Sequence, residues 1–398
     1  MANRTFATRA CYVAAALLVL LGGAEIARRQ ADLPSLPVLF DLQFDLTPRS
    51  QTWRLYDAVP LARSSRPQPL ASQPHAIDGL RLPWNQDSEI GLPEFLAVTN
   101  TRALLVVQDG KIAFEHYASG FDANSRFASF SVAKSFVATL TGAALAEGRI
   151  KSLDEPIGRY LGADEIAPAY AGITIGQLLD MRGGIDVDER YGGSLTSPVV
   201  RMYLSRDLAS FIARRHGLRF APGTRQEYRS VDTLVLSRVL ARATGRNLSQ
   251  YASEVLWQPL GMEQDATWSV DSDAHRIEKA FCCVNTTARD FAKLGLLYLD
   301  QGRASARQVV SAAWTNTPRQ VINGEQKLVY RDGWWIPPGN AGDRDFSAIG
   351  VFGQYVYVNP ATHTVIVKLS DHGVEQDELA TLAVMRHLSH VTGGLKPN

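Results

Sequence analysis

The sequence predicts an α/β protein of the α+β type, in which helices flank one antiparallel sheet and an all-helical subdomain is inserted. Three observations support this class. Strand-like patterns occur early in the main region, at residues 103–117, and again near its end, at residues 329–369. Helical patterns fill most of residues 150–320, and another helical pattern follows the last strand at residues 375–388. One sheet built from both chain ends accommodates this order.

The N-terminal region, residues 1–29, carries the features of an export signal. Arg4 and Arg9 precede an apolar stretch over residues 10–24, which matches the positive and apolar regions of a signal peptide. The same stretch could also be retained as a short membrane anchor, so cleavage and anchoring remain alternatives. Both alternatives predict an exported protein, either periplasmic or anchored in the inner membrane and facing the periplasm.

Residues 30–94 are expected to form an irregular leader. They are rich in proline and arginine, and residues 64–69, Ser-Ser-Arg-Pro-Gln-Pro, are the least structured point. No strong periodicity is found in this leader. The hydrolase domain proper is therefore placed at residues 95–390, with its helical subdomain at about residues 150–320.

The domain opens with a predicted β-hairpin. An apolar run at residues 103–108 is followed by Asp109-Gly110 and then by an alternating run at residues 111–117. Aspartate followed by glycine favours the two-residue turn that joins paired strands. Near the other end of the domain, strands are expected at residues 329–337, 350–358 and 364–369.

A long helix is predicted to begin at Ser131. Val132, Phe136 and Leu140 fall on one apolar stripe, and Gly148 stands where the C-terminal cap is expected. The helix therefore presents a serine at its N-terminus and an apolar face to the core.

Ser131 and Lys134 form the candidate catalytic pair. A serine hydroxyl is a poor nucleophile at neutral pH, so an enzyme that uses it must supply a nearby base. Positions i and i+3 share one helix face, which brings the Lys134 amine close to the Ser131 hydroxyl. Burial among neighbouring phenylalanines would lower the pKa of the lysine and make its neutral amine available.

The four-residue spacing alone is weak evidence, because Ser-x-x-Lys arises often by chance. Its placement at the start of a long apolar helix, after an aromatic-rich loop, is what favours a functional interpretation.

With this placement the sequence resembles the penicillin-recognising serine hydrolase superfamily, which includes class C β-lactamases. The resemblance covers about residues 95–390 and is strongest toward the 6-aminohexanoate-dimer hydrolase branch. Besides Ser131 and Lys134 it rests on four segments in order: residues 173–179 (Ile-Thr-Ile-Gly-Gln-Leu-Leu), 222–228 (Pro-Gly-Thr leading to Tyr228), 257–262 (Trp-Gln-Pro-Leu-Gly-Met) and 287–292 (Thr-Ala-Arg-Asp-Phe-Ala). It implies the expected fold and an acyl-enzyme on Ser131.

The second motif of that family, Tyr-x-Asn, corresponds to Tyr228-Arg229-Ser230. The resemblance makes Tyr228 the partner of Lys134 in proton transfer, and a neighbouring lysine cation is expected to lower the pKa of this phenol. Ser230 stands where the family has asparagine. We expect it to make a shortened substrate contact in place of the amide.

The third family motif, Lys-Thr-Gly or His-Thr-Gly on a strand, corresponds to Val351-Phe352-Gly353. Gly353 is expected to let substrate lie against the strand, and the backbone N–H groups of Ser131 and Gln354 are expected to form the oxyanion hole. Val351 replaces the cation that would bind a β-lactam or peptide carboxylate. The resemblance also places a substrate-contacting tyrosine at Tyr191, although an exposed loop tyrosine explains this residue equally well.

Composition argues against several other classes of protein. The formal net charge is +1, and charges of both signs are spread along the chain, so no nucleic-acid partner is predicted. The sequence contains no zincin, Walker A or Rossmann pattern, so neither a metal nor a cofactor is predicted. Cys282 and Cys283 are adjacent, a spacing that does not easily reach normal disulfide geometry, and they are interpreted as two buried thiols.

Together these features predict a serine hydrolase that cleaves a small amide or ester. A D-Ala-D-Ala peptidase or β-lactamase is the alternative enzyme, favoured by export and opposed by Ser230 and Val351. A non-catalytic binding protein that keeps the fold is a second alternative, opposed by the presence of Ser131, Lys134 and Tyr228. The natural substrate and the oligomeric state are not predicted.

Overall fold

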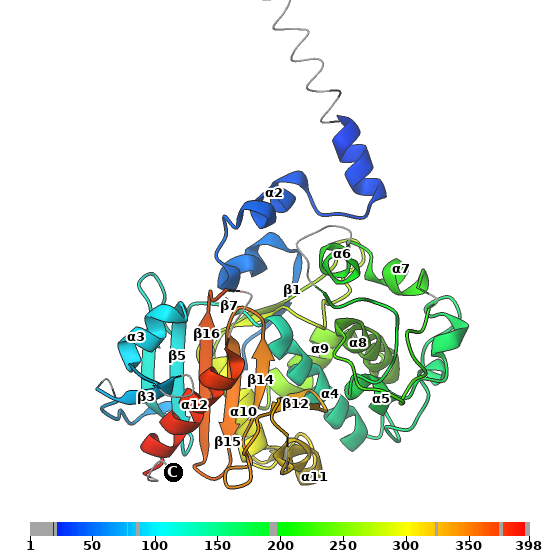
Figure 1. Ribbon diagram of the computed structural model, residues 1–398. Helices are drawn as coiled ribbons and strands as arrows, with labels where there is room; N and C mark the ends of the chain where they lie inside the picture. The colour runs from blue at the N-terminus through cyan, green and yellow to red at the C-terminus, as the bar shows by residue number, and fades with distance from the viewer. Residues whose placement is uncertain are drawn as a thin grey trace, which may run out of the picture.

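An eight-stranded sheet forms the centre of the computed structural model (Figure 1). The structure describes residues 19, 22–77, 79–84, 88–190, 197–215, 217–322, 325–373 and 377–394. The strand order is β12-β13-β14-β15-β16-β5-β6-β2, and every pairing is antiparallel except that of β2 with β6. The strands are β2 (Ala71–Ser72), β5 (Thr101–Gln108), β6 (Lys111–Tyr117), β12 (Val329–Arg331), β13 (Trp334–Ile336), β14 (Phe346–Gly350), β15 (Gln354–Asn359) and β16 (Thr364–Ser370).

The pairing of β5 with β16 joins the two ends of the domain, as the sequence predicts. The expected hairpin is confirmed as β5 and β6, and both turn residues have the positive φ that such a turn requires, 48° at Asp109 and 74° at Gly110. The predicted fold class, an antiparallel sheet flanked by helices, is therefore confirmed.

Each face of the sheet is covered by a helix. Leu105 and Val107 on β5 belong to the core that includes α10 (Ala288–Leu299). Their neighbours Leu104 and Val106 point to the other core, which includes α12 (Glu378–Thr392). Figure 1 shows α12 in front of the sheet and α10 behind it. A strand buried on both faces explains why residues 103–107 are continuously apolar.

Two of the strands predicted near the C-terminus are interrupted by turns. The run at residues 329–337 is a hairpin of β12 and β13, because Asp332 and Gly333 have φ values of 46° and 91°. The strand expected at 350–358 begins only at Gln354, and the preceding strand β14 was not predicted. A turn with positive φ at Phe352 and Gly353 separates β14 from β15.

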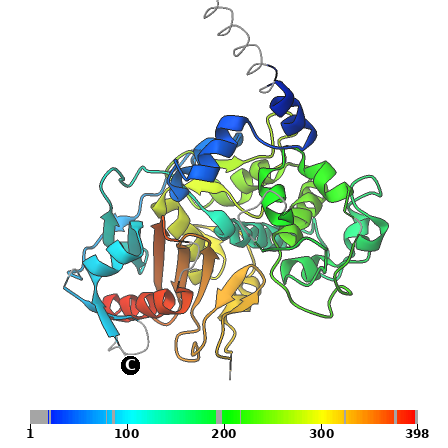
Figure 2. The same ribbon diagram turned by 45° about the horizontal axis from the view of Figure 1, so that its top comes forward.

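The middle of the chain forms the helical region, which lies beside the sheet in both views (Figures 1 and 2). Its helices are α5 (Ile175–Leu179), α6 (Pro198–Leu204), α7 (Leu208–Ala213), α8 (Ser230–Thr244) and α9 (Leu248–Ala252), with short turns η3 (Ile157–Arg159), η4 (Pro168–Tyr170) and η5 (Ser253–Trp257). The region is not wholly helical, because β8 (Ala266–Ser269) and β9 (Val284–Thr286) belong to a second sheet. The remaining short elements are β10 (Arg303–Ala304), β11 (Arg307–Gln308), α11 (Ala312–Asn316) and η6 (Thr317–Arg319).

The second sheet has the order β1-β8-β9-β7 and connects the N-terminal segment to the active-site region. Strand β1 (Ala58–Leu61) pairs with β8, and β7 (Phe127–Ala128) pairs with β9. Residues 30–94 are thus more regular than expected, because β1 and β2 pair with strands outside the segment and β3 pairs with β4. The other elements of this segment are α2 (Leu36–Phe44), η1 (Arg49–Leu55), β3 (Arg81–Trp84), β4 (Ser88–Gly91) and the start of α3 (Leu92–Val98).

The extreme N-terminus bears on the predicted export signal. Most of the apolar stretch at residues 10–24 lies outside the described residues. Among the residues that the structure describes, no helix has the length and apolar character needed to cross a membrane. Export and anchoring remain predictions from the sequence.

Candidate active site

Ser131 and Lys134 lie together at the junction of the sheet and the helical region. Ser131 belongs to the short 3-10 turn η2 (Phe130–Val132), and α4 (Ala133–Ala146) begins two residues after it. The serine therefore precedes the predicted helix instead of starting it. The Lys134 Nζ donates a hydrogen bond of 2.8 Å to the Ser131 Oγ, so the expected contact forms. Ser131 remains partly exposed, whereas Lys134 is 2% exposed.

The Lys134 amine is held in a mainly desolvated position. It donates a second hydrogen bond of 2.8 Å to the carbonyl oxygen of Phe281. Burial lowers the pKa of Lys134 to about 8, and the negative charge of Glu189 acts in the opposite direction. The expected lowering of this pKa is confirmed in direction and cause. The neutral amine is therefore more abundant near neutral pH than in a solvent-exposed lysine.

Tyr228 lies against the same lysine, just before α8. The Lys134 Nζ is 5.0 Å from the centre of the Tyr228 ring, and Tyr330 and Trp335 pack on that ring at 5.3 and 5.2 Å. The expected lowering of the Tyr228 pKa is wrong. Burial raises this pKa well above its usual value, and the interaction with Ser131 opposes the shift only in part. Tyr228 therefore stays a neutral phenol that can donate a proton.

The second motif, Tyr228-Arg229-Ser230, holds the loop at residues 187–189 through hydrogen bonds. The Ser230 backbone N–H donates to the Glu189 Oε2 at 2.8 Å, and the Ser230 hydroxyl donates to the other oxygen of that carboxylate. Arg229, which is 1% exposed, donates to the carbonyl oxygen of Val187. Ser230 is fully buried, so the structure does not support its predicted substrate contact.

Glu189 is the site residue that sequence reasoning did not assign. Its carboxylate accepts both Ser230 donors and places a negative charge where it raises the pKa of Lys134. The signal in the sequence is the pair of adjacent carboxylates Asp188 and Glu189, which does not by itself suggest a role. Only folding brings this loop to the N-terminus of α8. The neighbouring candidate, Tyr191, lies outside the described residues.

The third motif forms the turn between β14 and β15 and does not lie on a strand. A Cβ on Gly353 would lie 2.9 Å from the Ser370 Cβ. The absence of a side chain therefore lets the turn pack closely against β16, whereas the sequence predicted that it would let substrate lie against the strand. The Gln354 side chain is fully buried and donates to the carbonyl oxygens of Phe352 and Ser370 at 2.9 and 2.8 Å. The Gln354 side chain therefore stabilises the turn at residues 351–353.

Gly350, at the end of β14, is a second residue that sequence reasoning missed. A Cβ at this position would lie 2.6 Å from the Ser129 carbonyl oxygen and 3.1 Å from the Ser131 backbone nitrogen. A side chain there would therefore crowd the backbone of the nucleophile. Glycine therefore lets β14 pack closely against the backbone that carries Ser131.

Cys282 and Cys283 form a disulfide, so the prediction of two separate thiols is wrong. A positive φ of 75° at Cys283 is part of the local backbone that accommodates neighbouring bonded cysteines. The disulfide lies between two contacts that support the catalytic pair. Phe281 accepts the hydrogen bond from Lys134, and the carbonyl oxygen of Val284 accepts one of 2.9 Å from the Ser129 N–H.

A lowered lysine pKa is not unique to this site. Burial lowers the pKa of Lys368 to about 7, and its Nζ donates to the Ser370 Oγ at 2.6 Å. Ser370 is fully buried, however, and no cavity described here opens onto it. Ser131 differs because its side chain is partly exposed.

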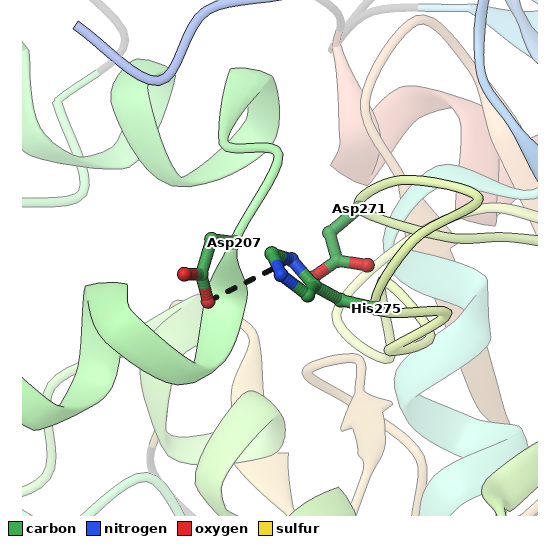
Figure 3. Close-up of side chains that lie close together, drawn as sticks. All are labelled: Asp207, Asp271 and His275. Carbon is green, nitrogen blue, oxygen red and sulfur yellow. Dashed lines mark ion pairs between the residues drawn. The ribbon is translucent and has the colours of Figure 1, made fainter. Parts of the chain in front are cut away.

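Asp207, Asp271 and His275 form a cluster whose ligand atoms lie within 4.8 Å of one another (Figure 3). Asp271 accepts backbone hydrogen bonds from Leu208, Ser272 and Ile277, and Asp207 accepts one from Ser210 at the start of α7. These contacts hold the loop before α7 against the segment after β8. These backbone contacts explain the cluster, which is remote from Ser131 in sequence.

The fold and the site together define a class of protein. A partly exposed serine, a buried lysine three residues later and a tyrosine against that lysine stand at the edge of an antiparallel sheet. Serine hydrolases that use lysine in place of histidine have this arrangement. The sequence matches the family described as Beta-lactamase over residues 98–388, and the chain belongs to that family. It is a serine hydrolase.

Individual relatives define the branch more closely. The chain is 32% identical over 345 residues to a 6-aminohexanoate-dimer hydrolase of Paenarthrobacter ureafaciens. This match covers 80% of this chain and 83% of the relative. A "Putative D-alanyl-D-alanine carboxypeptidase" of Escherichia coli O157:H7 is 26% identical over 123 residues, 30% of this chain and 28% of that protein.

A solved structure, "Putative 6-aminohexanoate-dimer hydrolase from Bacillus anthracis", superposes with a TM-score of 0.79 at 22% identity. The match covers 89% of this chain and 95% of that one. At this identity the likeness establishes the fold alone.

The disulfide makes a direct prediction. When the protein is unfolded without reductant and treated with iodoacetamide, Cys282 and Cys283 should remain unmodified, because both sulfurs are engaged in the bond. Mass spectrometry should find their peptide lighter by two hydrogen atoms than the reduced form. The same treatment after a dithiol reductant should modify both. Full modification of both cysteines without reductant would contradict the assignment.

Proposed function

We propose that the protein hydrolyses a small amide or ester through an acyl-enzyme on Ser131. The observation that carries this proposal is the 2.8 Å hydrogen bond between Lys134 and Ser131, together with the pKa of about 8 that burial gives the lysine. A neutral amine at that distance accepts the hydroxyl proton, and a base poised near the working pH is the most effective one.

Acylation then follows from the positions of the three side chains. The neutral Lys134 amine takes the Ser131 proton while the Oγ forms a bond to the substrate carbonyl carbon. The bond from that carbon to the leaving nitrogen or oxygen breaks as the leaving atom receives a proton. Tyr228, a neutral phenol against both groups, passes the proton on and recovers it from the lysinium.

The negative charge on the carbonyl oxygen requires hydrogen-bond donors. The proposed donors are the backbone N–H groups of Ser131 and Gln354, as the family resemblance implies. Two observations support them. The turn η2 packs against both β14 and β15, and glycine at position 350 allows β14 to lie close to the Ser131 backbone nitrogen. The Gln354 side chain holds the turn in place.

Deacylation uses the same groups in reverse. Water attacks the ester carbon, Lys134 takes a water proton, and the Ser131 oxygen leaves with a proton returned from the lysine. The products are a carboxylic acid and the regenerated serine. Acylation has already released the amine or alcohol.

The proposed substrate class is an amide or ester without a β-lactam ring. Support for this class comes from the relative at 32% identity, which is named 6-aminohexanoate-dimer hydrolase. Val351 supplies no cation at the third motif to bind a β-lactam carboxylate. Hydrolysis of nitrocefin at a rate comparable to that of p-nitrophenyl esters would instead favour the β-lactamase alternative.

Substitution of the nucleophile tests the assignment. Ser131→Ala should abolish labelling by a fluorophosphonate probe and lower kcat for p-nitrophenyl esters by at least about a thousandfold, because no other group replaces the nucleophile. Ser370→Ala is the matched control, since it removes the serine beside the other buried lysine, and it should retain labelling. Labelling that persists in Ser131→Ala would contradict the proposal, as would labelling lost only in Ser370→Ala.

The pH dependence tests the role of Lys134. The neutral amine is the active base, so kcat/KM should rise as pH increases through about 8. Glu189→Gln removes the charge that raises this pKa and should shift the rising limb to lower pH. Ser230→Ala removes a contact with the same carboxylate but leaves its charge, so its midpoint should stay near that of the wild type. A shift in Ser230→Ala alone would show that the charge of Glu189 does not set the pKa.

A further inference from the structure

A cavity of about 490 Å³ lies between the N-terminal segment and the loops of the active site. Three walls form it. Leu39 and Leu42 come from α2, Val200 and Leu204 come from α6, and Phe130 belongs to the wall beside the nucleophile. Both views show α2 lying over the junction between the sheet and the helical region (Figures 1 and 2). The volume is within the usual range for small-molecule sites.

The cavity adjoins the acyl side of the proposed reaction. Phe130 immediately precedes Ser131, and Phe352 lies two residues before Gln354, so the lining includes neighbours of both proposed oxyanion donors. Their rings pack against each other at 5.0 Å. The lining contains none of the proposed reacting or oxyanion-binding residues themselves, so the cavity lies beside the reacting atoms, next to Phe130 and Phe352. A substrate whose carbonyl oxygen faces the two donors would direct its acyl chain this way.

The lining carries little charge. Arg49 is its one charged side chain among the described residues, and it is paired with Asp45 while its guanidinium lies 4.8 Å above the Phe352 ring. Asp45 therefore offsets part of its charge. Most of the other lining side chains are aliphatic or aromatic, which matches a hydrocarbon chain.

Helix α2 gives independent support. Its sequence, Leu-Pro-Val-Leu-Phe-Asp-Leu-Gln-Phe, is strongly apolar, yet none of its residues is buried. Leu39 and Leu42 line the cavity and are only partly buried. An apolar ligand in the cavity would remove these side chains from water, which is favourable.

We propose that this cavity binds the aliphatic acyl chain of the substrate, so the enzyme hydrolyses esters or amides of medium-chain fatty acids. This inference rests on the proposed function and specifies its substrate class. The reaction is the acyl transfer described above. Ser131 bonds to the carbonyl carbon at the head of the chain, the alcohol or amine leaves with a proton, and water releases the fatty acid.

A series of p-nitrophenyl esters from acetate to decanoate tests the inference. For the wild type, kcat/KM should rise by up to about fourfold for each added methylene until the cavity is filled, since each buried methylene gains transfer free energy. Leu42→Trp fills the cavity and should move the optimum to shorter chains while acetate hydrolysis is retained. Val200→Trp, on the opposite wall, should have the same effect.

The matched control is Phe40→Trp on the same helix. Phe40 is 58% exposed and does not line the cavity, so this variant should keep the wild-type chain-length profile. Fluorophosphonate labelling of each variant shows that its Ser131 remains competent. A wild-type profile that is flat with chain length, or variants that are labelled but keep the wild-type optimum, would overturn the acyl-chain site. Absence of labelling in the wild type would instead overturn the proposed function itself.

Discussion

The burial of one lysine amine is the constraint on which the rest of the site depends. Lys134 is enclosed at the start of α4 between the Ser131 hydroxyl and the Phe281 carbonyl oxygen, and its pKa falls from 10.5 to about 8. At the usual conversion this is about 3 kcal/mol of destabilisation of the charged form. Neighbouring residues reduce this destabilisation or hold the amine in its buried position. Glu189 offsets part of the desolvation, and the disulfide and β9 hold the segment that carries the Phe281 carbonyl.

The two sheets place the parts of the site from distant stretches of sequence. Strands β14 and β15 of the large sheet deliver Gly350 and Gln354 beside η2, whereas β9 of the small sheet carries the segment after the disulfide. The N-terminal segment joins the small sheet through β1 and lays α2 over the active-site loops. The family match covers residues 98–388, so α2 lies outside it. This helix nevertheless contributes a wall to the cavity that we assign to the acyl chain.

Sequence reasoning succeeded where the determinants are local. The hairpin of β5 and β6 follows from an apolar run and an Asp-Gly turn, and the Ser131 contact follows from a three-residue separation at a helix start. It failed where the interacting residues are distant in the sequence. The pKa of Tyr228 depends on Tyr330 and on burial, the role of Glu189 depends on Ser230, and the regularity of residues 58–61 depends on β8. The motif predicted that Ser230 and Gly353 contact substrate. Instead, Ser230 donates a hydrogen bond to Glu189, and Gly353 packs against Ser370.

The most direct measurement is the mass of the protein during turnover of an ester whose acyl-enzyme hydrolyses slowly. Rapid quenching followed by peptide mapping should show the acyl group on the peptide that contains Ser131. The adduct should appear with release of the alcohol and disappear as the acid forms, since the covalent species is an intermediate. Steady turnover with no adduct on Ser131, or with the acyl group on another residue, would contradict the assignment of the Ser131 and Lys134 pair as the catalytic centre.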